Sequence, residues 1–177
     1  SKLEKTVVVV SSKSGSTVET DSQKRAFEVG FEAAGIDARK RIVIVTDPGS
    51  PMEKAALEDG YRVFNADPNV GGRYSALTAF GLVPSGLAGA DIASLLASAA
   101  NAGPSLASDS IDNPGLWLGA VLAASPGVAA HKDKFLIETD GLPGFGDWVE
   151  QLVAESTGKL QRGTLPVVVT KSAPEIL

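Results

Sequence analysis

The chain has 177 residues, enough for one sizeable hydrophobic core or for parts of two smaller ones. Its net charge of −5 argues against a nucleic-acid surface, which needs clustered Lys and Arg. One histidine and no cysteine exclude disulfides, thiolate metal sites and a metal site built from several histidines. No signal-peptide pattern follows the first residues, so we expect a cytoplasmic protein.

The first third of the chain alternates strands with helices. Runs of β-branched and aromatic residues predict strands, and segments with a helical hydrophobic period predict helices between them. In chain order these are a strand at 7–10, a helix that includes 27–34, a strand at 41–46, a helix at 52–59 and a strand at 61–64. This alternation predicts a parallel sheet of the α/β class with right-handed crossovers.

A hydroxyl-rich loop joins the first strand to the first helix. Open parallel sheets bind ligands at the carboxyl ends of their strands. A helix N-terminus also offers an anion free N–H groups and the positive end of its dipole. We therefore predict a phosphate site formed by Ser12, Lys13, Ser14, Ser16 and Thr17.

Two further observations bear on this loop. It matches neither the Walker A pattern nor the glycine-rich dinucleotide pattern, which disfavours ATP and NAD as ligands. Ser16 and Glu19 fit a capping box, in which each side chain bonds a backbone N–H at the start of the helix. The loop is therefore either a phosphate site or an ordinary turn that caps a helix.

A glycine pair precedes Arg73 where a loop becomes a helix, after a turn at 67–72. A cation in the first turn of a helix opposes the helix dipole. Arg73 therefore either faces an anion or turns away into solvent, and its position alone leaves both open.

The segment from Tyr74 to Ser108 carries a single charge, Asp91. Its glycines and prolines interrupt it too often for a membrane-spanning helix, so we predict two or three packed helices. Breaks are predicted at 101–104 and 112–115, and a helix at about 116–124.

A second α/β unit is predicted towards the carboxyl end, with a strand at 135–139, a helix at 147–157 and a strand at 165–169. Gln151 and Glu155 share one face of this helix, beside an apolar stripe that contains Trp148 and Leu152. A partly desolvated carboxylate can act as a general base, whereas an ordinary solvated face is the alternative. His131 has no evident partner, and we expect it at the surface.

Taken in order, the segments 12–20, 70–75 and 151–159 resemble the glucose-6-phosphate isomerase family. The resemblance runs from Val7 to about Val169 and corresponds to the middle of those enzymes, which have two sugar isomerase (SIS) domains. It implies an α/β fold, with a three-layer α-β-α parallel sheet of the SIS type and the start of a second such unit. The implied parts are part of a first SIS domain at 1–88, a helical connector at 89–130 and the beginning of a second SIS domain at 131–177.

The resemblance implies isomerisation of glucose 6-phosphate and fructose 6-phosphate through a cis-enediol. Glu155 would act as base and acid, and Arg73 would stabilise the enediolate. The implied substrate-binding residues are Ser12, Lys13, Ser14, Ser16, Thr17, Gly72 and Gln151. No metal or other cofactor is implied; the partners would be a sugar-phosphate substrate and, for the parent enzyme, a second copy in a homodimer.

Parts of the family pattern fall outside these 177 residues. A glycine-rich phosphate segment would precede Ser1, and a ring-opening histidine and a lysine would follow Leu177, so we expect an inactive fragment. The alternative is a non-catalytic SIS module that binds sugar phosphates for regulation and needs neither Arg73 nor Glu155. A bifunctional phosphoglucose and phosphomannose isomerase is disfavoured, because Gly71–Ser75 resembles the dedicated glucose enzyme.

Overall fold

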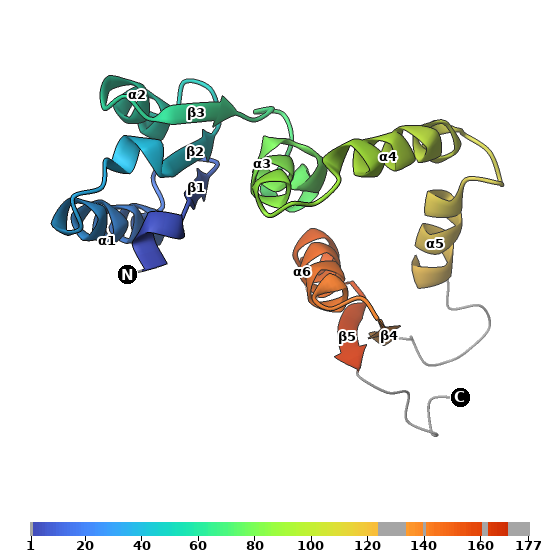
Figure 1. Cartoon of the computed structure of the whole chain (residues 1–177). Coiled ribbons are helices and arrows are strands. Elements are labelled where there is room, and N and C mark those ends of the chain that lie inside the picture. Colours follow the sequence, from blue (N-terminus) through green and yellow to red (C-terminus); the bar gives the residue numbers. More distant parts are fainter. Residues whose placement is uncertain (1, 124–133, 140, 161–162, 170–177) are drawn as a thin grey trace. The chain divides into compact units, whose positions relative to one another are not determined.

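The computed structural model describes residues 2–123, 134–139, 141–160 and 163–169 (Figure 1). The chain divides into two compact units, Ser1–Leu96 and Ala97–Leu177. The domain boundaries predicted after residues 88 and 130 stay a prediction, as does the surface position of His131, which lies outside the described residues.

The first unit is built on a three-stranded parallel sheet in the order β1-β2-β3. Its elements are η1 (Lys2–Lys5), β1 (Val8–Ser12), α1 (Val18–Ala33), η2 (Ala38–Lys40), β2 (Ile42–Thr46), α2 (Pro51–Glu58) and β3 (Arg62–Asn65). In the sheet, Val10 lies opposite Ile44, and Ile44 lies opposite Val63. The β-α-β-α-β order and the parallel sheet predicted from the sequence are confirmed.

The core of this unit lies between the sheet and the helices. Its buried residues are Val10, Phe31, Ile42, Ile44, Met52, Ala56 and Tyr61. They come from β1, α1, β2 and α2 and from the residue before β3, so one cluster joins both helices to the sheet. Fully burying an aliphatic or aromatic side chain of this size contributes about 1.5–3 kcal/mol to folding.

Beyond β3 the chain turns and enters two short helices, η3 (Gly72–Leu77) and α3 (Ala79–Leu87). The turn is held by the Asp67 carboxylate, which accepts a hydrogen bond from the Asn69 N–H at 2.9 Å. Thr78 separates the helices and caps α3 by accepting from the Phe80 N–H at 3.3 Å. The carboxyl end of β3 therefore leads directly into the segment that carries Arg73.

The second unit contains a parallel pair of strands with a helix between them in sequence. Helix α4 (Ile92–Ala107) spans the division between the units and is followed by α5 (Pro114–Ala123), β4 (Lys134–Glu138), α6 (Phe145–Thr157) and β5 (Leu165–Val169). Strands β4 and β5 pair in parallel, with Ile137 opposite Val168. The predicted start of a second parallel α/β unit is confirmed.

One of the two predicted breaks between the helices is wrong. Helix α4 continues through Pro104, where 101–104 was predicted to end a helix. A proline inside a helix removes one backbone donor and crowds the carbonyl four residues before it. The alanine- and leucine-rich residues of α4 before Pro104 favour a helix, which continues for three residues beyond it. The break at 112–115 is confirmed, since Asn113 accepts from the Gly115 N–H at 2.9 Å at the start of α5.

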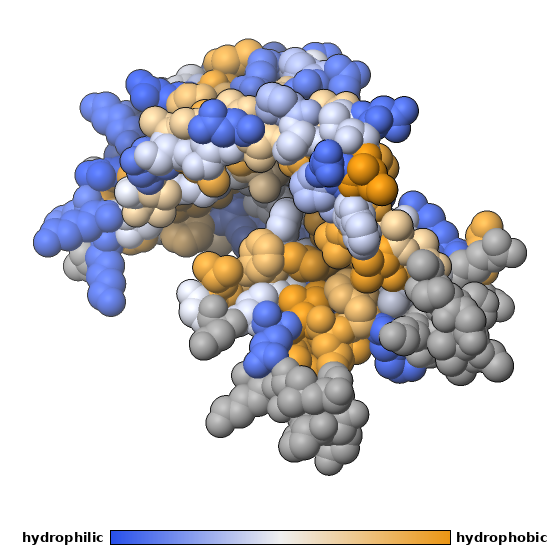
Figure 2. All heavy atoms as spheres, turned by 90° about the vertical axis from the view of Figure 1, so that its right-hand side faces the viewer, coloured by the Kyte–Doolittle hydropathy of each residue, from blue (hydrophilic) through white to orange (hydrophobic). Residues whose placement is uncertain are grey.

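Apolar side chains form much of the molecular face drawn in Figure 2. In the second unit, those more than half exposed include Leu106, Ile111, Leu116, Trp117, Leu118 and Val121. None of the helices described by the structure has the length and apolar character needed to cross a bilayer.

Candidate functional site

The loop after β1 is shaped by its own hydroxyl groups. Ser12 is the last residue of the strand and is only 6% exposed. Its Oγ lies 3.1 Å from the Thr17 Oγ1 and accepts the Gly15 N–H at 3.2 Å. Ser14, Ser16 and Thr17 are exposed, so the loop directs hydroxyl groups to its surface while the Ser12 hydroxyl holds its form.

The capping box predicted for Ser16 and Glu19 is wrong. Helix α1 begins at Val18, one residue later than a Ser16 cap requires, and Thr17 occupies the capping position. Ser16 instead donates its hydroxyl to the Ser14 Oγ at 3.0 Å, and the Thr17 side chain makes no capping hydrogen bond. These side chains therefore leave the first N–H groups of α1 available to an anion.

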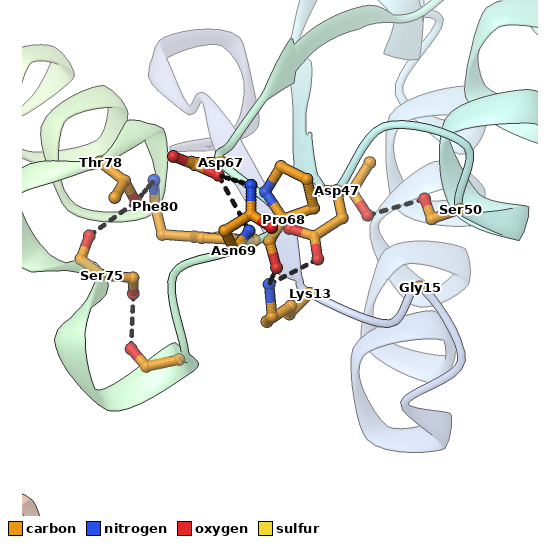
Figure 3. Close-up of polar contacts among 12 residues, drawn as sticks. Lys13, Gly15, Asp47, Ser50, Asp67, Pro68, Asn69, Ser75, Thr78 and Phe80 are labelled. Carbon is orange, nitrogen blue, oxygen red and sulfur yellow. Dashed lines mark hydrogen bonds and ion pairs between the residues drawn. The ribbon is translucent and has the colours of Figure 1, made fainter.

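Lys13 is paired within the fold. Its Nζ lies 2.6 Å from the Asp47 Oδ2 and donates to the Pro68 carbonyl oxygen at 3.0 Å (Figure 3). Sequence reasoning missed Asp47, although it directly follows the strand beside β1. Because the carboxyl ends of parallel strands meet at one edge of a sheet, a charged residue at the end of β2 is a natural partner for one after β1.

Both the backbone conformation at residue 15 and the close approach of neighbouring atoms require a glycine there. Its φ is +68°, and a Cβ on this residue would lie 2.7 Å from the Met52 Cβ and 2.9 Å from the Met52 nitrogen. The loop therefore packs directly on the start of α2, where no larger residue fits.

We expect Gly15→Ala to destabilise the first unit by about 1–3 kcal/mol, because overlap with Met52 adds to the strain of a positive φ. Thermal denaturation measures the loss. Gly35→Ala is the matched control, since Gly35 has a φ of +69° with open space around it. Equal losses in the two variants would contradict the close packing of the loop on α2.

Arg73 lies in η3 at the predicted start of a helical segment, which is a 3₁₀ helix. Its side chain is half-buried, and its guanidinium carbon lies 5.3 Å from the centre of the Tyr74 ring. Ser75 donates its hydroxyl to the Gly72 carbonyl oxygen at 2.6 Å, which tightens the turn. Whether the Arg73 side chain faces an anion or solvent stays open, as it was in the sequence.

Gln151 and Glu155 lie on α6 in the second unit, which confirms the predicted helix, and both are exposed. Leu152 beside them is half-buried, and Trp148 packs on Phe145 with ring centres 5.7 Å apart. The structure thus groups the loop with Asp47 and Pro68 in one unit, and Gln151 with Glu155 in the other. Among the described residues, no group of three carboxylate or imidazole side chains is arranged to hold a metal ion.

These features define a parallel α/β protein whose polar loops gather where its strands end. A probable glucose-6-phosphate isomerase of Haloarcula marismortui is 35% identical to this chain over 161 residues, which are 91% of the chain and 37% of that protein. The glucose-6-phosphate isomerase of Rippkaea orientalis is 37% identical over 160 residues, which are 89% of the chain and 30% of that enzyme. No family model matches the chain.

Solved structures agree with these relatives. A glucose-6-phosphate isomerase from Chlamydia trachomatis superposes with a TM-score of 0.75 at 26% identity, over 95% of this chain and 35% of that one. A hypothetical protein from Thermus thermophilus superposes with a TM-score of 0.81 at 32% identity, over 94% and 41%.

Over most of its length the chain is therefore similar to glucose-6-phosphate isomerases, and the resemblance noted in its sequence is confirmed. The fold class is confirmed with it, as a parallel α/β sheet with the start of a second such unit. The chain spans 30–38% of the length of the curated relatives it matches.

Proposed function

We propose that the full-length protein containing this chain is a glucose-6-phosphate isomerase, which interconverts glucose 6-phosphate and fructose 6-phosphate. The observation that carries the proposal is the loop at residues 13–17. It presents hydroxyl groups and uncapped helix N–H groups at the carboxyl end of β1, in a chain whose named relatives are glucose-6-phosphate isomerases. Such a loop suits the phosphate group at the non-reacting end of the sugar.

The hydroxyl groups of this loop have two roles, one in binding the phosphate and one in keeping the shape of the loop. Ser14, Ser16 and Thr17 are exposed and bind the phosphate, together with the N–H groups of the first turn of α1. The Ser12 hydroxyl is buried against Thr17 and keeps the loop in shape. Binding energy gained at the phosphate orients the reacting carbons, which raises the rate of the chemical step.

The chemistry belongs to Glu155 and Arg73. The Glu155 carboxylate removes the proton from C2 of the open-chain aldose and returns it to C1, while O1 gains a proton and O2 loses one. The guanidinium of Arg73 stabilises the negative charge on the enediolate oxygens between these steps. Gly72 and Gln151 contact the sugar, and the balanced proton transfer needs no metal or other cofactor. A cytoplasmic homodimer is the assembly we propose.

A coupled isomerase assay in both directions tests the proposal on the full-length protein. We expect turnover from the full-length protein and none from residues 1–177 alone, since these residues span about a third of the relatives. A full-length protein that binds fructose 6-phosphate without converting it would contradict the proposal and support the non-catalytic regulatory module. Turnover by residues 1–177 would contradict the need for the rest of the enzyme.

A further inference from the structure

One lysine ties together the segments that follow all three strands of the first unit. Lys13 follows β1, Asp47 follows β2, and Pro68 lies in the turn after β3. The Lys13 ammonium lies 2.6 Å from the Asp47 carboxylate and donates to the Pro68 carbonyl oxygen at 3.0 Å (Figure 3). A single cation therefore fixes the loop after β1 relative to the turn after β3.

Asp47 is the anchor of this arrangement. Its side chain is 16% exposed, and its Oδ1 is buried without a hydrogen-bond partner among the described residues. A carboxylate in this environment depends on its cation, because a buried charge without its counter-charge is costly. The backbone around it is also held, since the Thr46 hydroxyl donates to the Ser12 carbonyl oxygen at 2.7 Å and the Ala66 N–H donates to the Thr46 carbonyl oxygen at 3.0 Å.

The turn that contains Pro68 is followed in the chain by the helix η3, which carries Arg73. Asp67 accepts from the Asn69 N–H at 2.9 Å, and Val70 then connects this turn to Gly71 and to η3, which carries Arg73. Three residues therefore separate Pro68, where the turn is held, from the start of η3 at Gly72.

We infer that Asp47 is a positioning residue. It holds the Lys13 ammonium against the Pro68 carbonyl and so sets Arg73 relative to the phosphate loop. The inference rests on the proposed function and refines it, because the charge of Lys13 is used inside the fold and Asp47 itself touches no substrate. Substrate affinity then depends on the loop hydroxyls, and the rate depends on the placement that Asp47 maintains.

The kinetic test replaces Asp47 with asparagine in the full-length protein, which keeps the shape of the side chain and removes its charge. We expect kcat to fall about tenfold or more, with KM for fructose 6-phosphate within about twofold of the parent value. Asp37→Asn is the matched control, because Asp37 pairs with Arg39 at 3.0 Å before β2, at the opposite end of that strand. An unchanged kcat, or a change in KM alone, would overturn the inference.

A double-mutant cycle tests the pathway from Asp47 through Lys13. We expect the losses in kcat from Asp47→Asn and Lys13→Met to be strongly non-additive, because both changes break the same pair. Additive losses would show that the two residues act separately and would overturn the inference.

Amide hydrogen exchange tests the same arrangement without any assay of activity. We expect Asp47→Asn to speed exchange about tenfold or more in residues 69–77 of the full-length protein, since the turn opens more often when its tie is lost. Asp37→Asn should leave these amides unchanged. Faster exchange in a protein without isomerase activity would reject the proposed function and keep the structural role of Asp47, whereas unchanged exchange would reject that role.

Discussion

Replacing Glu155 with glutamine in the full-length protein is expected to lower isomerisation by about 100- to 10,000-fold, the range typical for loss of a general base. Glutamine has nearly the same size and still forms hydrogen bonds, but its amide does not accept the proton from C2. Binding of fructose 6-phosphate should remain close to normal, because the phosphate loop lies elsewhere in the chain. Turnover is measured in the coupled assay, and binding is measured by calorimetry.

Glu150→Gln is the matched control for this experiment. Glu150 is also exposed on α6, and its replacement by glutamine makes the same change in net charge. It precedes Glu155 by five residues, which puts the two side chains about 140° apart around the helix axis. We expect its turnover to match that of the parent protein. Normal turnover in Glu155→Gln would refute the assignment of the base, and an equal loss in both variants would point to the charge of α6 as a whole.

The order and type of the strands could be predicted because the valine and isoleucine runs carry a local signal. Val7 to Val10 predict a strand with or without knowledge of the rest of the chain. The structure carries that strand on to Ser12, because Ser11 and Ser12 pair with Val45 and Thr46. The end of a strand is thus set by the register of its neighbour, which the residues of the strand alone do not encode.

The errors in the helices have a similar cause. Pro104 is a local signal for a break, yet the alanine- and leucine-rich segment before it favours a helix, and α4 continues to Ala107. Ser16 and Glu19 have the spacing of a capping box, but the Thr17 hydroxyl bonds Ser12 and the helix begins after it. For α1 the contact of Thr17 with Ser12 set the start of the helix, and for α4 the long helical segment before Pro104 outweighed the proline. The short sequence patterns alone allowed either outcome.

The candidate site shows the same division between local and distant information. The loop at 13–17 and the helical start at Arg73 follow from nearby residues, and both lie where the sequence placed them. The partner of Lys13 did not follow from the sequence, because Asp47 is 34 residues away and only the pairing of β1 with β2 brings it near. The sequence pattern therefore favoured a charge free to meet phosphate, whereas the fold uses that charge to join strand ends.

Gly81→Ala is expected to destabilise the first unit by about 3 kcal/mol, at the upper end for forced overlap in a packed region. Gly81 lies near the start of α3, and a Cβ there would overlap the carbonyl oxygen of Ala76 and lie 2.9 Å from its Cα. The obstacle is backbone rather than a flexible side chain, so η3 and α3 would have to move apart. Thermal denaturation of the full-length variant measures the loss.

Gly30→Ala provides the control, because Gly30 lies inside α1 and a Cβ there would meet only the Leu3 Cδ1, at an ordinary 3.8 Å. Alanine favours a helix interior over glycine by about 0.5–1 kcal/mol, so this variant should be as stable as the parent or slightly more stable. Similar melting of the two variants would contradict the close contact of η3 with α3. A large loss confined to Gly81→Ala would show that this contact holds the Arg73 segment at the end where η3 meets α3.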